Sequence, residues 1–188
     1  MKRFLVFLIS FLCLHSTVLA HISQEEYRGV YDALEPANFE YIFNLDPYQP
    51  DDYQKYIASP YPLLRSGTDF IFKDKTIPPG YYLLTPRKKD GAQYVLFKQD
   101  GKVKYIIPTY KTAIVDPLFY EQYIPTPKKT KWDKLSDFGN KFVSKTAKNS
   151  KRTPPPKAYI DINEIGDEFW EVILYYDNQK YFMIFERK

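Results

Sequence analysis

The sequence is poor in the side chains on which most enzyme active sites depend. It holds one cysteine, two histidines and seven glycines among 188 residues. Cys13 and His15 lie in the first stretch of the chain, and His21 follows shortly after. Catalysis by a serine or cysteine nucleophile needs a placed histidine, and ordinary zinc sites use histidine or cysteine. We therefore expect no nucleophilic triad and no zinc centre.

The motifs of phosphate and calcium binding are absent as well. The chain has no G-x-x-x-x-G-K-[ST], no G-x-G-x-x-G and no EF-hand loop. What is left for an enzyme is a carboxylate pair among Asp161, Glu164, Asp167, Glu168 and Glu171. Acids of this kind are common in solvated turns, and Glu168 and Glu171 point to opposite faces of a strand. We expect a protein that is not an enzyme and needs no cofactor, with a carboxylate-based hydrolase as the alternative.

The first twenty residues have the pattern of a secretory signal peptide. Met1-Lys2-Arg3 is basic, residues 4–14 are nearly all apolar, and Val18-Leu19-Ala20 offers small residues at the cleavage positions. The apolar run is too short to span a bilayer comfortably. Cleavage before His21 leaves a chain without cysteine, which fits a bacterial periplasm or bacterial secretion better than a eukaryotic extracellular domain. The prediction is an exported protein, periplasmic or extracellular.

The remaining residues, 21–188, suffice for one domain. Ser23 and Glu26 have capping-box spacing, and an apolar i, i+3, i+4 pattern predicts a helix that ends at Glu35-Pro36. Residues 36–68 are rich in proline and tyrosine, so we expect an extended wrap with one short helix near 51–58.

Strand patterns fill two later segments. We predict a meander over 69–115 and C-terminal strands over 158–187, together an antiparallel sheet in an α+β fold. The strands expected are 70–72, 81–85, 93–98, 102–107, 112–115, 158–162, 169–176 and 180–187.

The hairpin over 93–107 turns at Asp100-Gly101, a two-residue loop signature. A regular register opposes Lys98 to Val103 and Phe97 to Lys104. It also opposes Leu96 to Tyr105, Val95 to Ile106 and Tyr94 to Ile107. Both faces are then largely apolar, so we expect the sheet to be covered on both sides.

A basic amphipathic helix is predicted near 131–149, between Pro127 and Pro154. Its apolar stripe is expected to pack on the sheet, and its opposite side carries Lys134, Lys141, Lys145 and Lys148. Residues 128–152 hold nine lysines or arginines against two aspartates, whereas the net charge of the whole chain is only +4. These four lysines are therefore the candidate site for an anionic surface.

Two binding functions follow from these observations. The lysine strip favours a cell-envelope-associated module that contacts an anionic membrane surface or envelope polymer. The alternative is a carbohydrate- or peptide-binding domain that uses exposed aromatic rings, since the chain has 18 tyrosines and 18% aromatic residues. We expect no nucleic-acid partner for an exported protein, and the sequence indicates no oligomeric state.

Overall fold

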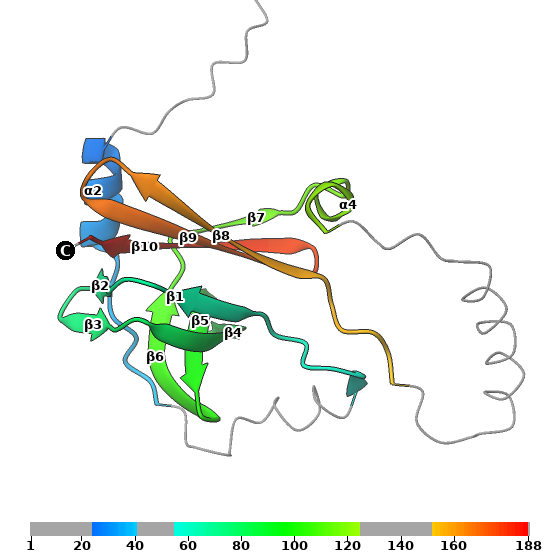
Figure 1. Ribbon diagram of the computed structural model, residues 1–188. Coiled ribbons are helices and arrows are strands. Elements are labelled where there is room, and N and C mark those ends of the chain that lie inside the picture. Colours follow the sequence, from blue (N-terminus) through cyan, green and yellow to red (C-terminus); the bar gives the residue numbers. More distant parts are fainter. Residues whose placement is uncertain (1–23, 41–54, 125–151, 188) are drawn as a thin grey trace, which may run out of the picture.

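The computed structural model describes residues 24–40, 55–124 and 152–187. In chain order the elements are α2 (Gln24–Ala33), β1 (Leu63–Ser66), β2 (Phe70–Phe72), β3 (Lys75–Ile77), β4 (Gly80–Lys89), β5 (Ala92–Gln99), β6 (Lys102–Pro108), β7 (Lys111–Ile114), α4 (Phe119–Tyr123), β8 (Ala158–Ile165), β9 (Phe169–Tyr176) and β10 (Gln179–Glu186). The prediction of antiparallel strands over 69–115 and 158–187 is confirmed, and the part of the chain described here is mostly β-sheet (Figure 1).

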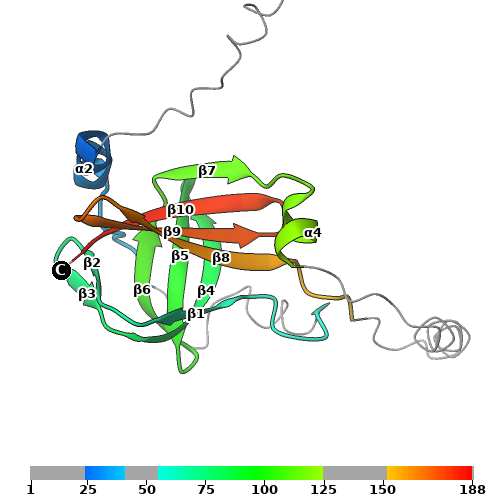
Figure 2. The ribbon, with the colours of Figure 1, turned by 45° about the horizontal axis from the view of Figure 1, so that its top comes forward.

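These strands form two sheets instead of one. One sheet has four strands, in the order β1-β4-β5-β6. The other has six: five follow one another in the order β3-β2-β10-β9-β8, and the sixth, β7, pairs with β10. The two sheets lie face to face, and their strands cross instead of running side by side (Figure 2). The predicted meander is therefore divided, because its middle strands belong to one layer and its ends to the other.

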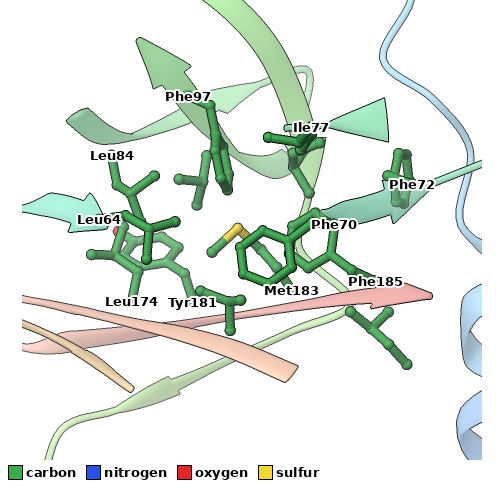
Figure 3. Close-up of a cluster of buried hydrophobic side chains, with 14 of the residues drawn as sticks. Leu64, Phe70, Phe72, Ile77, Leu84, Phe97, Leu174, Tyr181, Met183 and Phe185 are labelled. Atoms are coloured by element: carbon green, nitrogen blue, oxygen red, sulfur yellow. The ribbon is translucent and has the colours of Figure 1, made fainter. Parts of the chain in front are cut away.

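The core lies between the two layers. Leu64, Leu84 and Phe97 point from the four-stranded sheet toward Leu174, Met183 and Phe185 of the six-stranded sheet (Figure 3). Burying a side chain of this size stabilises the folded state by about 1.5–3 kcal/mol. Alternate residues of β9 and β10 face this core, as the period of two in a strand requires.

The hairpin of β5 and β6 has a different register from the regular one predicted. Lys98 faces Val103 as expected, but Phe97 faces Tyr105 and Leu96 faces Ile106. The predicted pairs of Phe97 with Lys104, Leu96 with Tyr105, Val95 with Ile106 and Tyr94 with Ile107 are wrong. A β-bulge inserts Lys104 as an extra, exposed residue, so each later pair moves by one position.

Both faces of β5 are nevertheless buried, as the apolar pattern predicts. Val95 and Phe97 belong to the core between the sheets, and Leu96, on the opposite face, is equally inaccessible. Asp100 and Gly101 both have positive φ, the conformation that a tight hairpin loop of this composition uses.

Helix α2 closes one end of the six-stranded sheet. The buried ring of Tyr31 contacts Phe72 and Phe169, and its hydroxyl accepts a hydrogen bond from the Lys73 backbone N–H at 2.6 Å. Arg28 pairs with Glu168 and Glu186 at 2.6 and 2.5 Å. The predicted helix is therefore attached to the sheet by the packing of Tyr31 and by the two ion pairs of Arg28.

Several predictions lie outside the described residues. These are the signal peptide 1–20, most of the short helix near 51–58, the amphipathic helix near 131–149 and its lysines Lys134, Lys141, Lys145 and Lys148. Two short strands, β1 and β3, had not been expected. β1 falls in the segment predicted to be an extended, proline-rich wrap. β3 has no apolar run that would predict a strand, because two of its three residues are the polar Lys75 and Thr76.

Candidate functional site

The acids considered for catalysis are mostly engaged in separate contacts. Glu168 pairs with Arg28, and Glu164 accepts a hydrogen bond from Arg187 at 3.1 Å. Glu171 is 8% exposed and accepts hydrogen bonds from the Tyr110 hydroxyl and the Asn163 amide. Its hydrogen-bond partners are therefore a phenol and an amide, which hold the carboxylate in place without supplying a second acid.

Tyr110 links this carboxylate to helix α2. Burial and the neighbouring Glu171 raise the pKa of the Tyr110 phenol, so it stays protonated and donates to the carboxylate. Tyr27 of α2 packs edge-on against the Tyr110 ring with centroids 6.3 Å apart, and burial likewise raises the pKa of Tyr27. The arrangement joins α2, the β6–β7 connection and β9, which is a structural role.

A shallow hollow beside α2 is lined by Gln24, Glu25, Arg28 and Glu168 and has a volume of about 660 Å³. The cation in its wall, Arg28, is already held by two carboxylates and lies 4.5 Å from the centre of the Phe169 ring. We therefore infer that the residues lining the hollow serve to attach α2 to the sheet, and we do not take the hollow as a ligand site.

The opposite end of the six-stranded sheet carries an aromatic cluster, and Figure 1 shows α4 lying there, away from α2. The cluster is made of Phe119, Tyr120, Tyr123, Tyr159 and Tyr175. Phe119 stacks on Tyr175 of β9 with centroids 4.1 Å apart and on Tyr123 with centroids 4.6 Å apart. Tyr159 of β8 contacts Phe119, Tyr123 and Tyr175. Three elements thus hold one rigid group of rings.

The cluster lies on the outer face of the sheet. Ile173 and Tyr175 contact it, whereas Val172 and Leu174, their neighbours along β9, face the core between the sheets. The short helix α4 therefore gains its stability from this packing, since five residues are too few to be helical on their own.

Cations and carboxylates surround these rings. The Lys180 ammonium lies 5.1 Å from the centre of the Tyr175 ring, and the Lys157 ammonium lies 5.7 Å from that of Tyr120. Burial, and to a smaller extent the negative charge of Asp177, raises the pKa of Tyr120 to about 12. Burial and, less strongly, the charge of Asp161 raise the pKa of Tyr175. The faces of the rings thus accept ammonium groups in this structure.

Apolar side chains around α4 are exposed to solvent. Ile114, Leu118, Tyr123 and Ile124 are 80%, 67%, 52% and 37% exposed, and we call these four residues the α4 patch. Single exposed apolar residues are ordinary, but four within eleven residues of the sequence, next to a packed ring cluster, make this segment the candidate for a contact surface. The patch is the candidate functional site.

The exposed tyrosine rings of the part of the chain that the structure describes do not form a row. Within the described ranges, the large tyrosines that are mainly exposed are Tyr81, on β4, and Tyr123, on α4. One lies on a strand of the four-stranded sheet and the other on a helix. Six further tyrosines are buried, namely Tyr31, Tyr61, Tyr82, Tyr120, Tyr175 and Tyr181. Of the tyrosines in the described ranges, all but Tyr81 and Tyr123 are buried or partly buried and serve packing.

Sequence reasoning missed this site. The segment 116–124 follows a strand and holds aromatic and large aliphatic residues in close succession, but it has no strand or helix period long enough to interpret. The predicted lysine site, by contrast, falls outside the described residues and stays a prediction.

No protein-family model matches the sequence, and no match was found among curated proteins or among solved structures. Within residues 24–40, 55–124 and 152–187, no three side chains of histidine, cysteine, aspartate or glutamate come together as metal ligands. In the same ranges no helix has the length and apolar character of a membrane span.

Proposed function

We propose that the protein is an exported, non-catalytic binding module that takes a peptide segment of a partner protein on the α4 patch. The observation that carries this proposal is the half-exposed ring of Tyr123, stacked on the ring of Phe119, in a short segment where Leu118 and Ile124 are exposed as well. An amphipathic ring held rigidly loses little conformational entropy on binding, which is why tyrosine is enriched at the centres of interfaces.

A peptide suits the patch better than a glycan. Sugar binding by aromatic residues benefits from several exposed rings, and the patch presents one. Its other members, Ile114, Leu118 and Ile124, are aliphatic and favour apolar side chains of a protein ligand.

Export and envelope association rest on the sequence. The basic and apolar pattern of residues 1–20 supports secretion. The strip of Lys134, Lys141, Lys145 and Lys148 supports a second contact, with an anionic lipid or polymer. On this proposal the lysine strip retains the module at the envelope while the α4 patch holds the ligand.

Selection from a random peptide library tests the binding site directly, whatever the partner protein is. Peptides are selected on the chain as purified from expressing cells, and each is then titrated against Tyr123→Ala, Leu118→Asp and Tyr81→Ala. Tyr81 is the matched control because it is 56% exposed on the other sheet.

We expect the first two variants to lose about tenfold or more in affinity, the effect of a tyrosine or apolar residue at an interface centre, and Tyr81→Ala to bind like the parent. Equal binding by all variants, with unchanged circular dichroism, would refute the assignment. A glycan array screened with the same variants tests the carbohydrate alternative.

A further inference from the structure

Strand β8 forms an edge of the six-stranded sheet. It pairs with β9 along all eight of its residues, from Ala158 to Ile165, and has no second strand neighbour among the described residues. Figure 2 shows β8 at the border of its layer, next to α4. A long edge of this kind is a template for an added strand unless the protein protects it.

One donor on this edge is occupied locally. The Ile162 backbone N–H donates to the carboxylate of Asp161 at 3.1 Å instead of to β9, so this N–H faces the open side of β8. The bond is short-range and exposed, and a carbonyl of an incoming strand can replace it. Displacement releases the Asp161 carboxylate, which is then available to accept a charge-assisted hydrogen bond from a cationic side chain of the incoming strand.

The two faces of β8 present different side chains along the edge. Tyr159, Asp161 and Asn163 lie on the outer face, whereas Ile160 and Ile162 alternate with them on the inner face. Ile162 is 38% exposed. An added strand would therefore place one set of side chains beside a carboxylate and the other beside isoleucines.

The edge is also continuous with the α4 patch. Tyr159 lies near the start of β8, and its ring centre is 5.7 Å from that of Tyr123. A segment bound against Tyr123 can thus continue along β8 past Asp161.

The geometry points to β-strand addition at β8 by an extended peptide that carries basic side chains at alternate positions. This inference rests on the proposed function and names its ligand class. The peptide donates and accepts backbone hydrogen bonds along the edge, sets Lys or Arg beside Asp161 and sets apolar residues beside Ile160 and Ile162. A second copy of the chain is disfavoured as the added strand, because its β8 carries the same acids.

The test uses two synthetic decapeptides, acetylated and amidated, of alternating Lys and Val and of alternating Glu and Val. Calorimetric titration of the purified chain should show binding of the Lys peptide, weakened by salt, and none of the Glu peptide. A third peptide has the Lys sequence with every backbone nitrogen methylated. It keeps the charge but has lost its backbone donors, so we expect it not to bind.

Variants of β8 separate strand addition from general charge attraction. Ile162→Pro removes the outward N–H without touching the ladder to β9, and Ile162→Ala keeps that N–H while losing the side chain. We expect Ile162→Pro to bind the Lys peptide about fivefold more weakly than Ile162→Ala does. Asp161→Asn should weaken binding about threefold, whereas Asp167→Asn, an equal charge change in the β8–β9 turn, should leave affinity unchanged.

Failure of this inference is distinguishable from failure of the proposed function. Library peptides that depend on Tyr123 but bind Ile162→Pro as tightly as Ile162→Ala would leave the α4 patch in place and overturn strand addition. Equal binding of the Lys and Glu peptides, tight binding of the methylated Lys peptide, or no binding of the Lys peptide at about 1 mM would each overturn it too. If Ile162→Pro does not fold, the comparison of the methylated with the unmethylated Lys peptide tests strand addition in its place.

Discussion

The ring of Phe119 lies parallel to that of Tyr175, with centroids 4.1 Å apart and an angle of 4° between the planes. The two residues are far apart in the sequence, one on α4 and the other on β9. Their contact holds α4, which carries Tyr123, against the outer face of the six-stranded sheet, so it supports both proposals.

We predict that Phe119→Ala detaches α4. Removing the ring deletes its stacking on Tyr175 and Tyr123 and should lower the free energy of unfolding by about 2–4 kcal/mol, as ring truncations at packed sites do. Tyr123→Ala, at a half-exposed position, should cost less than about 1.5 kcal/mol. Urea denaturation followed by circular dichroism measures both. Equal costs for the two variants would contradict the central place given to Phe119.

The hydrogen bond from Tyr110 to the buried carboxylate of Glu171 should contribute to the free energy of unfolding. Tyr110→Phe keeps the ring against Tyr27 but removes the hydroxyl that donates to Glu171, which should cost about 1–3 kcal/mol. Glu171→Gln replaces the charge and should cost less when combined with Tyr110→Phe than alone, because the two groups interact. A double-mutant cycle in urea measures this coupling. Additive costs would show that the hydrogen bond contributes nothing.

Stability should fall as the pH rises from about 10 to 12. The pKa of Tyr120 is about 12 in the folded protein, above the ordinary value of 10.0, so the folded state holds the proton where the unfolded state has lost it. The stabilisation is complete below pH 10 and is lost as the pH approaches the folded pKa. Burial raises the pKa of Tyr175 in the same direction.

The measurement for Tyr120 is the urea midpoint at intervals across this pH range. Tyr120→Phe removes one of the shifted phenols, so its midpoint should fall less steeply with pH than that of the parent chain. Tyr81→Phe serves as the control, since Tyr81 is exposed. Identical pH slopes for the parent and Tyr120→Phe would contradict the assignment.

The docking of α2 should depend on salt. Arg28 pairs with Glu168 and Glu186 at partly exposed positions and lies over the Phe169 ring. Arg28→Ala should lower the free energy of unfolding by about 1–2 kcal/mol at low ionic strength and by less in about 1 M salt, since exposed ion pairs are screened. Arg65→Ala, at an exposed position on β1, is the matched control. A loss that does not change with salt would assign the effect of Arg28 to packing alone.

The strands were predictable because their signals are local. Alternating and continuous apolar runs located β9 at its observed limits and β5 and β6 within one residue at each end, and Asp100-Gly101 located the turn between the last two. Helix α2 was predictable for the same reason, from its apolar period and the proline that follows. The bulge at Lys104 was not, because a hairpin sequence does not show where one strand takes an extra residue.

The β-rich character of the chain, the positions of most strands and the absence of a nucleophile–histidine pair after His21 can be read from the amino-acid order alone. The three-dimensional fold was needed to show that the strands divide into two crossed layers, that Phe119 meets Tyr175, and that β8 lies at an edge beside Tyr123. The difference comes from distance along the chain. Hydrogen bonds and side-chain periods act between near neighbours, whereas sheet order and ring packing depend on which distant apolar faces cover one another.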